Sequence, residues 1–164
     1  MSHGSDENFS VQGSENVTVQ NCMITRGDNN YSILVGENNY NLSFIGNYLS
    51  HTRQRNFLVG YGTHGETSEY INNIIYGYEE GMNVVWGNNT DILGNIYKSF
   101  LNNKPNNVAI AWKPNSFNNP NASITDGSLY FSDNFQLNPH DYEIYHSDAV
   151  AQKKSNRVIN NSLI

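Results

Sequence analysis

The sequence predicts an all-β fold, a single-stranded right-handed parallel β-helix (a solenoid) of about six coils. An asparagine-containing phrase recurs along the chain at intervals in the twenties, and apolar runs that end near glycine lie between its copies. No segment shows the 3.6-residue spacing of apolar residues that is typical of a helix. Only 37% of the residues are hydrophobic, which agrees with the thin core and large solvated surface of a solenoid.

The recurring phrase consists of an apolar residue, a small or polar residue and an asparagine, and it predicts the same bend in each coil. Equivalent side chains of successive coils lie about 4.8 Å apart, so their amides can form a hydrogen-bonded ladder. Asparagine also tolerates the left-handed backbone of a tight bend. The residues assigned to the ladder are Asn21, Asn47, Asn73, Asn95, Asn134 and Asn161.

Each coil is expected to contain one strand that ends near glycine, a second strand that leads to the asparagine bend, and a short third stretch. The first strands are predicted at residues 9–11, 33–35, 57–59, 84–86 and 108–112. Side chains alternate between the two faces of a strand, so every second residue is expected to point into the core. The predicted inward residues are Val17, Val19, Leu42, Phe44, Ile45, Ile71, Ile74, Ile92, Ile96, Phe131 and Phe135.

Residues 1–164 are predicted to form one β-helix domain, with a long loop excursion around residues 99–127. That segment is rich in asparagine, proline and serine, and loops on a solenoid commonly form the walls of a binding cleft. Cys22 is the only cysteine, so an internal disulfide is excluded. Its place after an expected ladder asparagine predicts a small buried side chain.

Several partner classes are not expected. No apolar run approaches the length of about 20 residues that a membrane-spanning helix needs. This chain also shows no secretory signal sequence. The formal net charge is −6 and no basic face is evident, so nucleic acid is not an expected partner. The histidines lack the spacing of a zinc site, and no phosphate-binding loop or nucleophile elbow is present.

Two segments resemble the pectate lyases of polysaccharide lyase family 1. Residues 2–20 resemble the central part of that family, and residues 44–56 resemble the segment that carries its catalytic arginine. Residues 70–76 and 92–98 resemble its later coils, so the likeness covers about residues 2–98. The resemblance implies calcium-dependent β-eliminative cleavage of polygalacturonate, an acidic polysaccharide, by a protein that is extracellular in its full-length form.

The same resemblance implies the site residues. Arg55 takes the place of the base that removes the proton next to the sugar carboxylate, and Asp6 takes the place of a calcium ligand, with Glu7 beside it as a second metal candidate. Counting back along the strands that end near glycine puts Glu7, Tyr31 and Arg55 in one column of successive coils. The candidate substrate-binding residues are Arg53, Tyr31, His51 and Trp86.

The chain departs from the family pattern around Arg55. Phe57 stands where the family usually has a proline, and Tyr31 stands where it often has a lysine. Glu79 and Glu80 are expected near Arg55, and carboxylates there would keep its guanidinium protonated. An ordinary surface ion pair is therefore the alternative to a catalytic role for Arg55.

Two other functions stay open. The chain can be a non-catalytic β-helix module that binds glycans or assembles with other chains, as tailspike and adhesin stalks do, or a folded remnant without activity. The sequence starts close to the first predicted strand, and the open end of a β-helix exposes apolar side chains and unpaired strand edges. Self-association through the uncapped N-terminal coil is therefore the main rival hypothesis. Trp86 and Trp112 end equivalent strands and can either stack on a glycan or pack under a loop.

Overall fold

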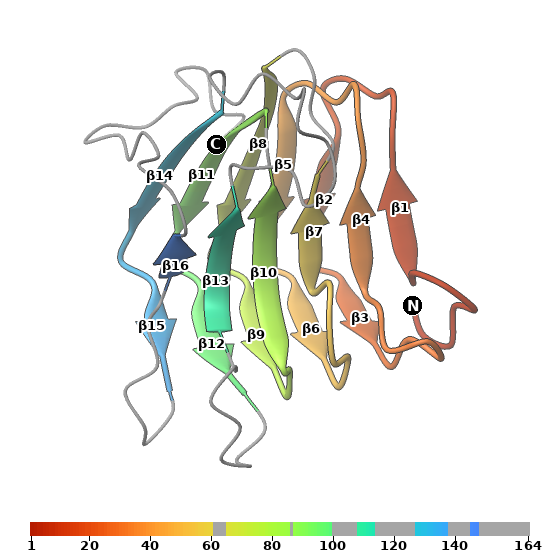
Figure 1. Cartoon of the computed structure of the whole chain (residues 1–164). Helices are drawn as coiled ribbons and strands as arrows, with labels where there is room; N and C mark the ends of the chain where they lie inside the picture. The colour runs from red at the N-terminus through yellow and green to blue at the C-terminus, as the bar shows by residue number, and fades with distance from the viewer. Residues whose placement is uncertain (61–64, 86, 100–107, 114–126, 138–144, 148–164) are drawn as a thin grey trace.

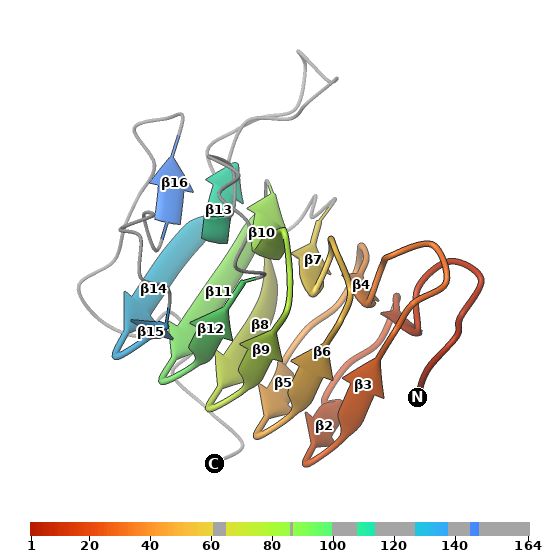
Figure 2. The ribbon, with the colours of Figure 1, turned by 90° about the horizontal axis from the view of Figure 1, so that it is seen from below.

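Three parallel sheets wind around a common core in the computed structural model of the chain (Figures 1 and 2). The structure describes residues 1–60, 65–85, 87–99, 108–113, 127–137 and 145–147. Every strand pairing among these residues is parallel, and none of them is helical. No helix in this part of the chain has the length and apolar character needed to cross a membrane.

Each of the first five coils contributes one strand to each sheet, so strands that are far apart in the sequence become neighbours. The first sheet contains β1 (Phe9–Val11), β4 (Ile33–Val35), β7 (Phe57–Val59), β10 (Glu80–Val85), β13 (Val108–Lys113) and β16 (Tyr145–Ser147). The second sheet contains β2 (Thr18–Gln20), β5 (Leu42–Ile45), β8 (Glu66–Ile71), β11 (Asn88–Leu93) and β14 (Ser128–Ser132). The third sheet contains β3 (Met23–Thr25), β6 (Tyr48–Ser50), β9 (Ile74–Tyr76), β12 (Ile96–Lys98) and β15 (Phe135–Gln136).

The predicted all-β solenoid is confirmed, with about four turns of the chain between β1 and β13. The larger number of coils stays a prediction, because the last expected repeat, around Asn161, lies outside the described residues. Most of the expected loop excursion around residues 99–127 also lies outside them, except for β13 within it.

An asparagine ladder connects the coils at the bend between the second and third sheets. The backbone N–H of Asn47 donates to Oδ1 of Asn73 over 2.9 Å, and that of Asn73 donates to Oδ1 of Asn95 over 2.8 Å. The ladder continues to Asn134, whose Oδ1 accepts from the backbone of Asn95 over 3.0 Å. The first three side chains are buried, so the ladder supplies partners to backbone groups that the bend would otherwise leave unpaired.

Two expectations for the first coil are wrong. The strand register aligns Cys22, not Asn21, with Asn47, and the Cys22 N–H donates to Oδ1 of Asn47 over 3.0 Å. Asn21 instead occupies the preceding place in the bend, as Gly46 and Asn72 do in later coils, and all of them have positive φ. Asparagine suits that left-handed place as well as the ladder place. Cys22, expected to be buried, is exposed.

The core contains a cluster of aromatic rings from the first and second sheets. The Phe44 ring of β5 stacks on the Tyr70 ring of β8 with centroids 5.2 Å apart. Phe57 of β7 meets Phe44 edge-on at 5.3 Å and Tyr70 at 4.7 Å. Such ring pairs contribute about 0.5–1.5 kcal/mol beyond the area they bury. These contacts hold neighbouring coils in a fixed register.

The predicted inward residues are confirmed best in the second sheet and are wrong in part of the third. Leu42, Phe44 and Ile92 are in the core as predicted, and Val17, Val19 and Phe131 pack against it. Ile45 and Ile71 pair with each other one residue after the core residues Phe44 and Tyr70, so they lie on the opposite face and the prediction for them is wrong. Ile96 aligns with Ile74 and Phe135, and the inward prediction for all three is wrong. Ile74 and Phe135 are 42% and 61% exposed. Ile75 and Tyr97 fill the core from the third sheet instead, because the side-chain phase there lies one residue from the expected one.

Candidate functional site

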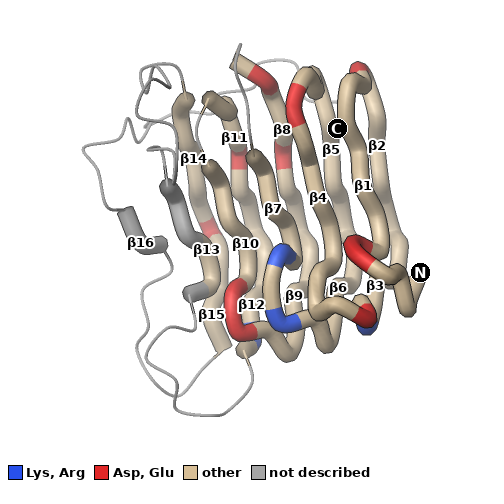
Figure 3. Tube along the Cα trace, turned by 45° about the vertical axis from the view of Figure 1, so that its right-hand side comes forward, with Lys and Arg blue, Asp and Glu red and all other residues tan. Residues whose placement is uncertain are grey.

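The candidate site lies just before the strands of the first sheet, at the bend that follows the third sheet. Glu7, Tyr31 and Arg55 each precede the strand of their own coil, β1, β4 and β7. Acidic and basic segments lie close together along this edge in Figure 3. The parallel register of the first sheet therefore brings these residues of successive coils close together, although the backbone bridge before the strands joins Tyr31 to Gln54, the neighbour of Arg55.

The Arg55 guanidinium contacts both other members of the column. Its Cζ lies 4.0 Å from the centroid of the Tyr31 ring, and its Nη1 donates to Oε1 of Glu7. The Arg55 side chain is 32% exposed, whereas that of Glu7 is 5% exposed. The site is thus a guanidinium that is partly open to solvent, with an aromatic ring on its face and a carboxylate beside it.

The backbone of Arg55 is unusual for a residue with a long side chain. Its φ is 52°, in the left-handed region that few residues other than glycine occupy. Its carbonyl accepts hydrogen bonds from the backbone of Ser32 over 3.2 Å and of Ile33 over 2.8 Å. These bonds to the preceding coil hold the left-handed conformation, which otherwise costs of order 1 kcal/mol. The bend therefore fixes the place from which the guanidinium extends over Tyr31.

Arg53 belongs to a separate ion pair. Its Nη2 lies 2.8 Å from Oε2 of Glu79, and the two side chains are 49% and 24% exposed. The hydrogen bond and charge of Glu79 raise the pKa of Arg53 above its usual value. Glu79 was expected near Arg55 but forms an ion pair with Arg53, and Glu7 pairs with Arg55. The two arginines thus form two matched pairs that differ in burial.

The other predicted site residues lie apart from this column or outside the described residues. His51 is exposed, and its ring meets that of Tyr76 edge-on at a centroid distance of 5.4 Å. Asp6 is exposed beside Glu7 in the loop before β1. Trp86 lies outside the described residues. The structure therefore brings together Glu7, Tyr31 and Arg55 from the predicted set.

The donors around Asp6 and Glu7 do not fit a calcium site made by this chain alone. Calcium takes about 6–8 oxygen ligands, and one oxygen of Glu7 already accepts from Arg55. Within the described ranges, no group of three or more His, Cys, Asp or Glu side chains is placed to hold a metal ion. Calcium binding by Asp6 and Glu7 therefore stays a prediction, and no chemical step is derived through it.

The geometry suits anion binding better than proton removal. The Arg55 guanidinium already acts as a hydrogen-bond donor, to the Glu7 carboxylate. A charged, partly exposed guanidinium offers paired N–H donors that match a carboxylate. The sequence interpretation missed the direct pair between Glu7 and Arg55, although opposite charges in one column of successive coils were the available signal.

Comparisons with known proteins give no further indication of a function for this chain. No family model, curated protein or solved structure matches the chain. The resemblance to pectate lyases therefore depends on the motif residues of the first coils alone.

Proposed function

We propose that this chain is a pectate-lyase-like, right-handed parallel β-helix of about six coils that binds an acidic polysaccharide of the polygalacturonate type, and that its full-length form is extracellular. The observation that supports this function is the Arg55 guanidinium, which is 32% exposed and lies over the Tyr31 ring beside the Glu7 carboxylate. A sugar carboxylate that approaches from solvent meets a cation that is already fixed in place.

Tyr31 and Glu7 have different roles in this proposal. The Tyr31 ring supports the face of the guanidinium, so fewer side-chain conformations are lost when a ligand binds. Glu7 competes with the sugar carboxylate for the same donors, which limits affinity. The chain has a formal net charge of −6, so a polyanion is repelled at long range and depends on this local attraction.

β-Eliminative cleavage is the catalytic form of the proposal. A base removes the proton next to the sugar carboxylate, the bond to the leaving sugar oxygen breaks, and a carbon–carbon double bond forms. For Arg55 to act as this base, its guanidinium must lose a proton, which requires that its contact with Glu7 be broken.

Arg55→Ala is expected to weaken binding of polygalacturonate by at least about tenfold, because a charge-assisted hydrogen bond contributes about 1.5–3 kcal/mol. Binding is measured by titration calorimetry at fixed salt, with and without calcium. Release of unsaturated product is followed in parallel by ultraviolet absorbance. Arg26→Ala is the control, since Arg26 is an exposed arginine outside both the Tyr31 column and the predicted site residues. Its affinity is expected to stay within about twofold of the wild-type value.

Glu7→Gln provides the opposite test, because it removes the competing carboxylate from Arg55 and is expected to raise the affinity. Product formation that is lost in Arg55→Ala supports the catalytic form, whereas Arg55-dependent binding without product supports a binding module. If wild-type protein does not bind polygalacturonate with or without calcium, or if both arginine variants bind equally well, the proposal is wrong.

A second candidate function, self-association through the N-terminal coil, is favoured by a separate observation. Phe9, Val17 and Val19 of the first coil are only partly buried against the core. Ile33 and Phe44, their neighbours in the next coil, are 0% and 1% exposed. A second chain that covers this end would bury these side chains and pair the free strand edges. Light scattering of the wild type and of Val19→Lys tests it, with a dimer expected only for the wild type.

A further inference from the structure

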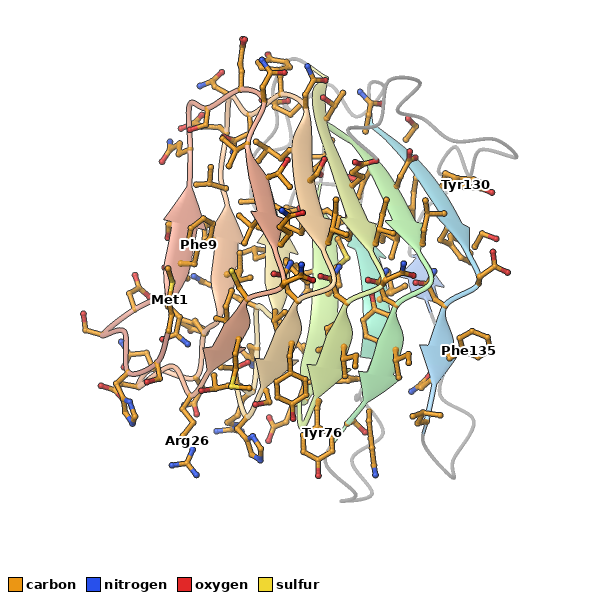
Figure 4. The ribbon with its side chains drawn as sticks, turned by 180° about the vertical axis from the view of Figure 1, so that it is seen from behind. Met1, Phe9, Arg26, Tyr76, Tyr130 and Phe135 are labelled. Carbon is orange, nitrogen blue, oxygen red and sulfur yellow. The ribbon has the colours of Figure 1, made fainter. Side chains whose placement is uncertain are left out.

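The large apolar side chains that are exposed among the described residues gather at one sheet. Met23, Ile74 and Phe135 of the third sheet are 64%, 42% and 61% exposed, and Met1 and Leu137 are 68% and 56% exposed. Figure 4 shows Met1 and Phe135 at opposite ends of the molecule. The exposed apolar surface therefore follows the solenoid over its described length.

Backbone hydrogen bonds join the two flanking residues to the third sheet. The Met1 carbonyl accepts from the backbone of Thr25 in β3 over 2.9 Å. The Leu137 N–H donates to the carbonyl of Tyr97 in β12 over 2.7 Å. Leu137 follows Gln136 in this register and extends the outward face. Met1, whose N–H donates to the Met23 carbonyl over 2.8 Å, lies opposite the buried Ile24 and is not part of that face.

The register of the third sheet makes this surface continuous. Parallel pairing aligns one residue from each of five consecutive strands in a single outward column. We name this column the apolar stripe, and its members are Met23, Tyr48, Ile74, Ile96 and Phe135. None of them is charged, although the chain has a formal net charge of −6. Tyr48 and Ile96 are half-buried and fill the spaces between the exposed members.

The apolar surface is large enough to matter for association. If a large side chain offers about 200 Å², the four exposed residues of this face, Met23, Ile74, Phe135 and Leu137, together present on the order of 450 Å². The largest apolar patch on a typical monomer measures about 300–600 Å² and is often functional. A standard interface buries about 800 Å² on each partner, so the stripe and a modest rim would suffice for a dimer.

We propose that the apolar stripe is a dimer interface, at which the third sheets of two copies of this chain pack face to face about a two-fold axis. Equivalent side chains of successive coils lie about 4.8 Å apart along the solenoid axis. The surface of a partner packs closely against many coils only if its side chains have the same spacing. A second copy has that repeat and the same uncharged residues, and a two-fold interface uses one patch on both partners. This inference is independent of the proposed function.

The charges around the stripe also favour a second copy. Lys98 of β12 points outward beside the stripe, with its Nζ 5.6 Å from the centroid of the Tyr76 ring. Arg26, which is exposed, follows β3 at the other end of the same edge (Figure 4). Two chains with a net charge of −6 repel each other. The two cations offset part of the negative charge at this edge of the stripe, which reduces that repulsion locally.

The test is the dissociation constant of the dimer, measured for the whole chain by sedimentation velocity over a range of concentrations. Ile74→Lys places a charge at the centre of the stripe and is expected to raise the dissociation constant by at least about tenfold. Phe135→Lys, near the end of the stripe, is expected to act in the same direction. Thr18→Lys is the matched control, because Thr18 is exposed on β2 of the second sheet. It is expected to leave the constant unchanged, and circular dichroism verifies that each variant is folded.

Each outcome decides the proposal. A wild-type dimer that dissociates in Ile74→Lys and Phe135→Lys, but not in Thr18→Lys, supports the stripe as the interface. A dimer that persists in both stripe variants and dissociates in Val19→Lys assigns the interface to the N-terminal coil and overturns the inference. A wild-type chain that stays monomeric at every concentration overturns it as well.

Discussion

Asn73→Ala is expected to lower the free energy of unfolding by about 4 kcal/mol. The Asn73 side chain is fully buried, and its Nδ2 donates to the carbonyl of Phe44 and to Oδ1 of Asn95, each over 2.9 Å. Its Oδ1 accepts from the backbone N–H of Asn47 over 2.9 Å and from the Asn47 amide over 3.0 Å. Alanine would leave the Phe44 carbonyl and the Asn47 N–H buried without these partners, and each such group costs about 1–3 kcal/mol.

The change is measured by urea unfolding followed by circular dichroism. Asn72→Gly is the matched control, because Asn72 is the adjacent asparagine but is exposed and has a positive φ of 53°. Glycine already occupies the equivalent place at Gly46 and Gly94. The control is therefore expected to change the free energy by less than about 1 kcal/mol. Equal losses in the two variants would show that the ladder does not stabilise the bend.

Phe44→Ala is also expected to lower the free energy of unfolding by about 4 kcal/mol, because replacing a buried Phe by alanine destabilises a protein by about 3–5 kcal/mol. Phe44 is 1% exposed and its ring contacts those of Tyr70, Phe57 and Phe9, which come from three other strands. Alanine would leave a cavity between neighbouring coils. The change is again measured by urea unfolding. The slope of the transition should be unchanged, so that a shift of its midpoint reports a change in stability.

Ile45→Ala is the control for Phe44, since Ile45 follows it in β5 and is only partly buried. Successive residues of a strand point to opposite faces, so Ile45 points away from the core. Its replacement is expected to cost no more than about 1.5 kcal/mol. A larger cost for Ile45→Ala than for Phe44→Ala would contradict the direction in which β5 faces the core.

The ladder shows how far the sequence alone predicts this fold. Asn47, Asn73 and Asn95 recur in one phrase, and their common bend follows from that recurrence. Asn21 was misplaced because a bend has two adjacent places that both accept asparagine, the left-handed place and the ladder place. Residue type alone does not distinguish them, whereas strand register does.

The third sheet shows where the pattern was too short to be decisive. Ile74 and Ile75 are adjacent isoleucines in the three-residue strand β9, so alternation of apolar and polar residues cannot tell which of them points inward. Phe135 begins a strand of two residues, which has the same limitation. The prediction placed both Ile74 and Phe135 in the core, and the exposed apolar stripe was missed for that reason.

The column of Glu7, Tyr31 and Arg55 could be predicted from the spacing of the coils, but its contacts could not. Two arginines and several glutamates lie near the same bend, and spacing alone does not decide which of them pair. The left-handed backbone of Arg55 directs its side chain over Tyr31 and toward Glu7. That conformation leaves no signature in the sequence, because glycine or asparagine is the usual residue at such a place.

The most direct test of stacked coils is a double-mutant cycle on Glu7 and Arg55, which are separated by 48 positions in the sequence. The free energies of unfolding are measured for the wild type, Glu7→Gln, Arg55→Ala and the double variant. Because the two side chains meet only if successive coils lie in register, a favourable coupling energy of about 0.5–1 kcal/mol is predicted. Two single changes whose effects simply add would contradict the stacking of these residues in one column.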